Sequence, residues 1–126
     1  MKILKTAQAY YPFQEKGGPV VKVRAIALGL AQRGHSVAIL TPDWGFQPSM
    51  APMMAAEKCR WGWCAQEQGV KAIFLRGAGH YRTLSLNPGM VSFSRASLGD
   101  FDVVHLYGLY DLLGPTVAFF CRRNHI

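Results

Sequence analysis

Apolar and polar residues follow one another in patterns that predict a strand, a helix and a second strand near the start of the chain. Residues 2–9 (KILKTAQA) alternate in part and predict an opening strand. Residues 20–33 repeat apolar side chains at the i, i+3, i+4, i+7 spacing of an amphipathic helix, and Gly34 follows in the usual position after a helix end. Residues 37–41 (VAILT) have the β-branched character of a buried strand. Such a unit predicts a right-handed crossover and a parallel sheet.

The rest of the chain predicts two more strands separated by irregular segments. Residues 42–69 show no clear period and contain three prolines, so we expect a long loop with at most a short helix near 53–60. Residues 76–89 predict a second loop, rich in polar and aromatic side chains. The fold class predicted is therefore α/β, with a Rossmann-like parallel sheet and helices on both faces. The remaining predicted elements are strands at 70–75 and 103–106 and helices at 90–98 and 114–123.

Length and composition limit what the chain can be. Its 126 residues suffice for one domain but not for two domains with a cleft between them. Half of the residues are hydrophobic and 17% are charged, which excludes an intrinsically disordered chain. No apolar run reaches the about 20 residues of a spanning helix, and the N-terminus lacks the apolar core of a secretory signal. We therefore expect a cytoplasmic location.

The net charge and the cysteine content limit the kinds of ligand, disulfide and metal site to be expected. The 14 Lys+Arg residues against 7 Asp+Glu give a net charge of +7, which indicates an anionic partner, with a solvated basic surface as the alternative. The basic residues are scattered, which argues against nucleic acid. Three cysteines without a secretory signal favour reduced thiols over a disulfide framework. Cys59 and Cys64 have no second pair to complete a zinc site, so no metal is expected.

Gly17-Gly18 lies between the first predicted strand and the first predicted helix. Without a Cβ atom, backbone amides there can approach a phosphate at the helix N-terminus, although a tight turn is the alternative. The dinucleotide pattern GxGxxG and the P-loop pattern GxxxxGK[ST] are both absent, which disfavours NAD, FAD and ATP as ligands of this loop.

Polar and aromatic residues follow the predicted strands, at the edge where open parallel sheets gather their ligands. His105 and Tyr107 end the last predicted strand; a buried, hydrogen-bonded histidine is the alternative reading of His105. The same edge is expected to hold Tyr10, Tyr11, Asp43 and Arg76.

Two segments of the chain carry distinctive motifs. The first, KGGPVVKVRAIALGLAQRGHSVAILTP, has the diglycine loop, an amphipathic helix ending in Arg33-Gly34-His35, and the strand Val37 to Thr41; the second is FDVVHLYGLY. They resemble the N-terminal domain of group 1 (family-4-like) glycosyltransferases of GT-B architecture, the second through the family's F-D-V-V-H-x-H/Y-G segment. The two matches occur in the expected order with a separation that fits, and the resemblance covers residues 2–41 and about 80–124.

The resemblance implies the acceptor-side half of a retaining glycosyltransferase, an enzyme that moves a sugar from a nucleotide-diphosphate donor to a hydroxyl acceptor. Many members carry a second histidine close to the reacting sugar where this chain has Tyr107, whose hydroxyl can still hydrogen-bond a sugar. In the family the diglycine backbone contacts the donor diphosphate, and the loops after the strands line the acceptor cleft. The resulting candidates are His105 and Tyr107 for catalysis, Gly17 and Gly18 for the diphosphate, and Tyr10, Tyr11, Arg76 and Arg82 for the acceptor.

The family's nucleotide-sugar pocket lies in a C-terminal domain marked by Glu-x7-Glu. The only glutamates here are Glu15, Glu57 and Glu67, and no two stand eight apart. We therefore expect residues 1–126 to be a truncated acceptor-side domain, inactive alone, that lacks the donor domain. The nucleotide sugar is a co-substrate, and no cofactor or metal is expected. A lipid-linked or polysaccharide acceptor, with peripheral contact at the inner face of a membrane, fits the positive charge.

Two other functions stay open at this point. A non-catalytic binding or scaffold module would use the open edge of an incomplete sheet. An unrelated doubly wound enzyme, such as a methyltransferase, would need an acidic residue after the second strand to hold a ribose, and Asp43 is near that place.

Overall fold

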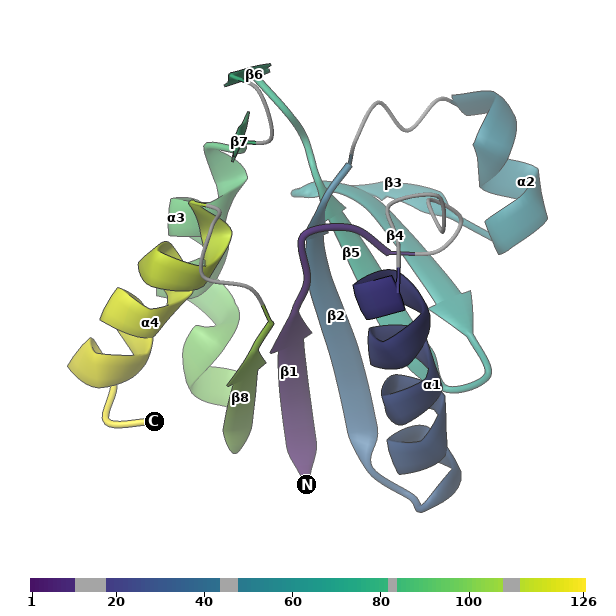
Figure 1. Ribbon diagram of the computed structural model, residues 1–126, viewed down its shortest axis with the longest axis horizontal. Coiled ribbons are helices and arrows are strands. Elements are labelled where there is room, and N and C mark those ends of the chain that lie inside the picture. Colours follow the sequence, from purple (N-terminus) through teal and green to yellow (C-terminus); the bar gives the residue numbers. More distant parts are fainter. Residues whose placement is uncertain (11–17, 44–47, 82–83, 108–111) are drawn as a thin grey trace.

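The computed structural model describes residues 1–10, 18–43, 48–81, 84–107 and 112–126. Strands and helices alternate along most of the chain (Figure 1). The elements are β1 (Lys2–Thr6), α1 (Gly18–Gln32), β2 (Ser36–Pro42), η2 (Pro48–Met50), α2 (Ala51–Met54), β3 (Glu57–Cys59), β4 (Gly62–Glu67), β5 (Val70–Leu75), β6 (Gly79–Tyr81), β7 (Leu84–Leu86), α3 (Gly89–Ser97), η3 (Leu98–Asp100), β8 (Val103–Leu106) and α4 (Leu113–Arg123).

Six strands form one sheet in the order β3-β4-β5-β2-β1-β8. The strands β5, β2, β1 and β8 run parallel, while β4 and β3 are antiparallel to their neighbours. The arrows of β1, β2 and β5 point the same way in Figure 1, and that of β4 points the opposite way. The predicted Rossmann-like α/β sheet is confirmed, with a mixed rather than wholly parallel edge.

Strand β2 lies at the centre of the sheet and is buried on both faces. Every residue of β2 after Ser36 is buried. Because successive side chains of a strand point to opposite faces, Val37 and Ile39 pack with one core cluster and Ala38 and Leu40 with the other. Burial on both faces explains why the sequence here is a continuous apolar run without alternation.

Helix α1 covers one face of the sheet, as the spacing of its apolar residues predicts. Val20, Val23 and Ala27 are buried against that face. The helix ends where Gly34 adopts a φ of +89°, and the His35 amide donates to the Leu30 carbonyl at 3.2 Å. This left-handed ending suits glycine, because a side chain there would be strained.

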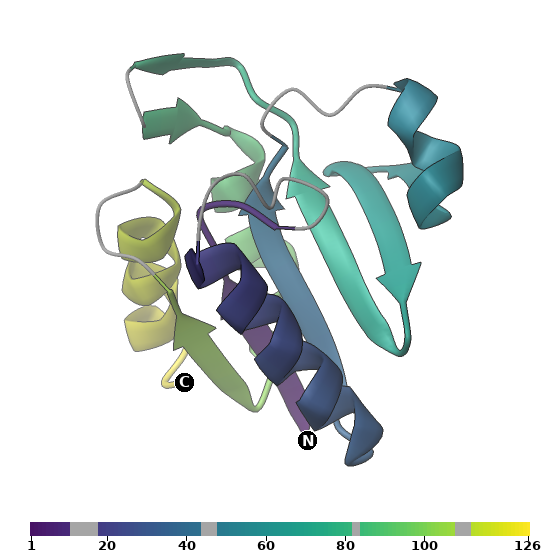
Figure 2. The ribbon, with the colours of Figure 1, turned by 45° about the vertical axis from the view of Figure 1, so that its right-hand side comes forward.

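Helices α3 and α4 cover the opposite face, so that α1 and α3 lie on the two sides of the sheet (Figure 2). Met90 and Phe93 of α3 and Val117 of α4 are buried in this second cluster. Both helices lie where the sequence predicts them. Among the residues described, no helix combines the length and apolar character needed to cross a membrane.

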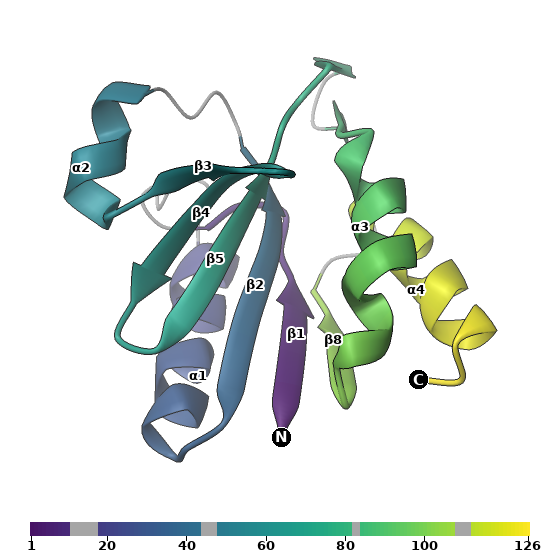
Figure 3. The same ribbon diagram turned by 180° about the vertical axis from the view of Figure 1, so that it is seen from behind.

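The prediction of a long loop at 42–69 is wrong. The short helical turns η2 and α2 come first, earlier than the helix expected near 53–60, and the antiparallel hairpin β3–β4 then extends the sheet beyond β5 (Figure 3). Gln68 and Gly69 join β4 to β5 with φ angles of +47° and +88°. Two positive φ angles in a two-residue connection mark the tight hairpin turn that matches strand twist. β4 is only partly buried, which weakened the apolar pattern.

The prediction of an irregular loop at 76–89 is wrong in part. Strands β6 and β7 form a separate two-stranded antiparallel ladder, in which Gly79 pairs with Leu86. Each strand has only three residues, which is too short for a periodic pattern to be recognised in the sequence.

Candidate functional site

The order of the parallel strands defines where a ligand site is expected. Across the sheet the parallel strands lie in the order β5-β2-β1-β8. The chain starts at β1, adds β2 and β5 on one side of it, and then returns to add β8 on the other side. The direction of progress therefore reverses between β1 and β8. In open α/β sheets, ligands bind beyond the carboxyl ends of the strands at such a switch point. We call the residues that surround it, Lys5, Thr6, His105 and Tyr107, the switch-point cluster.

The switch-point cluster is held by contacts between β1 and β8. Lys5 Nζ lies 2.9 Å from His105 Nδ1, and the two residues pair across the strands. The rings of His105 and Tyr107 are 4.4 Å apart, and Lys5 Nζ lies 5.0 Å from the centre of the Tyr107 ring. The Tyr107 amide donates to the Thr6 carbonyl at 3.2 Å, which continues the pairing one residue past β8. The structure thus places His105 and Tyr107 side by side, next to Lys5.

Burial controls the protonation of this cluster. Lys5 is only 1% exposed, and burial lowers the pKa of its ammonium group. Burial also lowers the pKa of His105, and the nearby positive charge of Lys5 lowers it further. When Lys5 is protonated its ammonium group can only donate a hydrogen bond, so His105 Nδ1 then accepts and the proton of the neutral ring lies on Nε2. The His105 side chain is exposed, so the neutral imidazole can offer its Nε2–H to a ligand.

This arrangement predicts a specific loss of stability in acid. The lowered pKa of His105 means that the folded protein binds this proton less tightly than the unfolded chain does. The contribution of His105 to the free energy of unfolding is therefore most favourable above the ordinary pKa of 6.5, and it falls as the pH drops below that value. Between pH 7.5 and 5.5, His105→Gln should lose less stability than the unmodified protein, measured by urea unfolding. His125→Gln, at an exposed terminal position, is the control. Equal pH dependence in all three proteins would contradict the assignment.

The other predicted site residues are placed differently. Helix α1 begins at Gly18, the position expected for a backbone contact with a phosphate. Gly17, Tyr11 and Arg82 lie outside the described residues. Tyr10 is only 1% exposed and belongs to the core beneath α1.

The hydroxyl of Tyr10 is buried without a hydrogen-bond partner among the described residues. Burial raises the pKa of this phenol, and the nearby Glu67 carboxylate raises it further. Leaving a buried polar group unpaired costs about 1–3 kcal/mol. We therefore expect Tyr10→Phe to raise the free energy of unfolding by about 1 kcal/mol, measured by urea denaturation. A decrease would mean that the hydroxyl has a partner in solution, such as a bound water.

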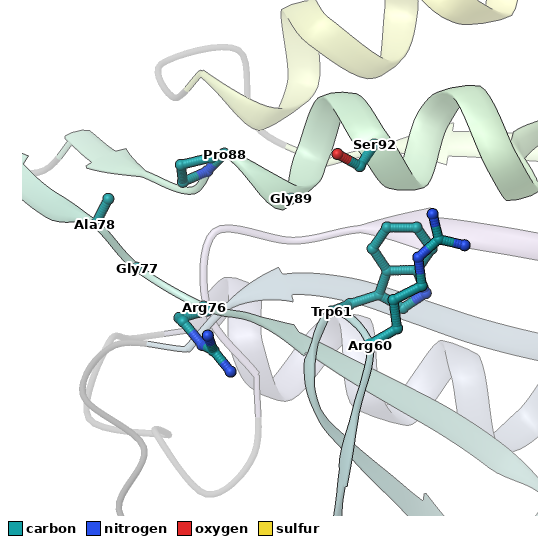
Figure 4. A pocket seen from close by; sticks show the side chains of 8 residues that line it. All are labelled: Arg60, Trp61, Arg76, Gly77, Ala78, Pro88, Gly89 and Ser92. Atoms are coloured by element: carbon teal, nitrogen blue, oxygen red, sulfur yellow. The ribbon is translucent and has the colours of Figure 1, made fainter.

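Arg76 contributes to a second feature, a pocket of about 290 Å³ beside the end of β5 (Figure 4). Arg60 and Trp61, from the turn between β3 and β4, form one side, and Ser92 of α3 lies on another. The Arg60 guanidinium stacks 4.6 Å from the centre of the Trp61 ring. The described residues that line it include two arginines and no carboxylate, so the pocket favours an anionic ligand. We call it the arginine pocket.

Asp43 lies close to the arginine pocket rather than at the switch point. Its carboxylate accepts a hydrogen bond of 3.2 Å from the amide of Gly77, which lines the pocket. Asp43 therefore fastens the segment after β5 to the segment after β2. This contact provides a structural reason for an acidic residue after the second strand.

Sequence reasoning missed Lys5, Arg60 and Trp61. The burial of Lys5 could have been predicted from the sequence, because the period-two alternation of β1 places Lys5 on the same buried face as Ile3. Arg60 and Trp61 had none, because their position depends on a hairpin that the sequence did not reveal.

Two residues of the resembling segments lie at the opposite edge of the sheet. The Lys2 amide donates to the Asp102 carboxylate at 2.8 Å, and the N-terminal amino group of Met1 lies 3.4 Å from His35 Nδ1. Both contacts join the amino ends of strands, which supports a structural role for Asp102 and His35.

Fold and site together define this protein as a Rossmann-like α/β protein whose polar residues gather at the switch point of its parallel strands. Comparison with protein-family models, with curated proteins and with solved structures gave no match.

Proposed function

We propose that the chain is the acceptor-side half of a retaining glycosyltransferase that transfers a sugar from a nucleotide-diphosphate donor to a hydroxyl acceptor. The observation that carries this proposal is the pairing of β8 with β1. This pairing brings together the two segments that carry the resemblance. His105 and Tyr107 belong to FDVVHLYGLY, and they lie beside the end of β1, the strand that leads to the diglycine segment. A match in sequence alone does not require these segments to meet in space.

The groups at the switch point suit a sugar hydroxyl. His105 offers a donor through Nε2, and the Tyr107 hydroxyl can donate or accept. Backbone amides at the start of α1 are available for the donor diphosphate, as the resemblance implies for Gly17 and Gly18. The chain's contribution to catalysis would then be positioning of the acceptor and stabilisation of the leaving diphosphate.

The arginine pocket supports an acceptor that carries an anionic group. Arg60 and Arg76 can each form charge-assisted hydrogen bonds with a phosphate or carboxylate. Phosphate-linked lipid saccharides and acidic polysaccharides both present such groups beside free hydroxyls, and both fit the net charge of +7.

The proposal can be tested by titrating the isotope-labelled chain with four ligand classes: nucleoside diphosphates, phosphorylated saccharides, acidic oligosaccharides and S-adenosylmethionine. We expect a saccharide acceptor to shift the amide resonances of Thr6 and Tyr107. Loss of one hydrogen bond in Tyr107→Phe should weaken that binding about fivefold. Tyr10→Phe removes the same hydroxyl from a buried position and should leave the affinity unchanged.

Four outcomes would contradict the proposal. Saturable binding of S-adenosylmethionine at the strand ends would favour a methyltransferase. No binding by any saccharide would remove the acceptor role. Sugar transfer by residues 1–126 alone would show that these residues already contain the donor site, whereas the proposal assigns donor binding to another domain. Acceptor binding that the intact protein never converts into transfer would favour a non-catalytic binding module.

A further inference from the structure

The hairpin β3–β4 places two of the three cysteines against each other. Cys59 pairs with Gly62 in the antiparallel register, so Cys64, two residues further along β4, projects from the same face. The two Sγ atoms lie 2.6 Å apart. Both side chains are partly exposed, and both are free thiols. The third cysteine, Cys121, is on α4.

We propose that Cys59 and Cys64 form a reversible dithiol–disulfide pair that is oxidised by exchange with a small-molecule disulfide such as glutathione disulfide. The register and the contact between the two sulfur atoms carry this proposal, and it is independent of the sugar-transfer function.

The exchange proceeds in two balanced steps. The Cys59 thiolate attacks one sulfur of glutathione disulfide, whose S–S bond breaks and releases one glutathione thiolate that takes up a proton. The Cys64 thiolate then attacks the Cys59 sulfur of the mixed disulfide and releases the second glutathione. The protein loses two protons and two electrons, and glutathione disulfide is reduced to two thiols.

The environment of the two sulfurs favours this order of attack. Burial raises the pKa of Cys64 to about 12, and its hydrogen bond with Cys59 adds to the shift. The Cys64 thiolate is therefore scarce at neutral pH, and Cys59, at the edge strand, is the better first nucleophile. Partial exposure leaves room for a small disulfide to approach.

Oxidation would act on the arginine pocket. Between the two cysteines lie Arg60 and Trp61, which form one side of that pocket. The Trp61 ring packs edge-on against Phe93 of α3, with ring centres 5.4 Å apart. A covalent link between Cys59 and Cys64 closes a short ring around Arg60 and Trp61, so it restricts the turn that positions the Arg60 guanidinium.

The test is equilibration of the chain in glutathione redox buffers, followed by thiol counting and peptide mapping by mass spectrometry. We expect two thiols to be lost together, with the link mapped to Cys59–Cys64 and Cys121 still reduced. Because the fold holds the sulfurs in contact, the internal disulfide should form at least about tenfold more favourably in the native protein than in concentrated urea. The urea sample is the essential control, since residues this close in sequence also pair in an unfolded chain.

Matched variants separate the proposal from general thiol reactivity. Cys121→Ser should retain the internal disulfide, whereas Cys59→Ser and Cys64→Ser should each leave only a glutathione adduct. Amide hydrogen exchange at Arg60 and Trp61 should slow on oxidation of the unmodified protein. Equal disulfide formation in native and urea samples, a stable glutathione adduct on the unmodified pair, a link to Cys121, or unchanged exchange at Arg60 and Trp61 would each overturn the proposal.

Discussion

Gly62→Ala is expected to destabilise the protein by about 2–6 kcal/mol, the sum of backbone strain and overpacking in the core. Gly62 begins β4 with a φ of +144° and is buried. A Cβ atom added there would lie 2.3 Å from the Phe74 carbonyl oxygen and 2.9 Å from the Arg76 amide nitrogen. Both neighbours are backbone atoms of or beside β5, so relief requires β4 to move. Urea denaturation followed by circular dichroism measures the loss.

The control for this prediction is Gly29→Ala, in the interior of α1. A Cβ atom at Gly29 would meet nothing within 4 Å. Replacing a helical glycine by alanine stabilises a helix by about 0.5–1 kcal/mol. Opposite signs at the two glycines are therefore expected. A loss below about 1 kcal/mol for Gly62→Ala would mean that the hairpin is not held against β5 as described.

Phe74→Ala is expected to lower the free energy of unfolding by about 3–5 kcal/mol. Phe74 is fully buried and packs in the core cluster beneath α1. Its strand, β5, is hydrogen-bonded on both sides, to β2 and to β4, so the backbone cannot move to fill the space left by the ring. The cost therefore includes both the lost burial and a persistent cavity. Urea denaturation again measures the effect.

Phe119→Ala is the matched control, because Phe119 lies on the outer side of α4 and is 61% exposed. Substitution there should change stability by less than about 0.5 kcal/mol. Similar losses at Phe74 and Phe119 would contradict the placement of β5 at the centre of the sheet and of Phe119 on the surface of α4.

The strands and helices predicted from the sequence share one property: they bury a continuous or periodic set of apolar side chains. The run VAILT predicts a strand because β2 is covered on both faces. The spacing of Val20, Val23 and Ala27 predicts α1 because one side of that helix faces the sheet. β4 lies near the edge of the sheet and is half-exposed, so its sequence GWCAQE carries no comparable pattern. The two-residue turn at Gln68-Gly69 was the one local signal for it.

The candidate site divides in the same way. His105 and Tyr107 can be found from the sequence, because residues that follow a buried strand in a parallel sheet lie at its carboxyl edge. The burial of Lys5 can be read from the alternation of β1, but its contact with the imidazole of His105 cannot, because the two residues are distant in sequence and meet only when β1 pairs with β8. Arg60 likewise approaches the segment of Arg76 only because β4 folds back along β5.

The sequence by itself determined the α/β class and the order of the main strands and helices along the chain, because each depends on local patterns of side chains. The tertiary structure decided the order of the strands across the sheet, the burial of Tyr10, the contact between Lys5 and His105, and the contact between the sulfur atoms of Cys59 and Cys64. These features depend on which strands become neighbours and in which register. Register is set by packing of the whole sheet against its helices, and no short stretch of sequence contains that information.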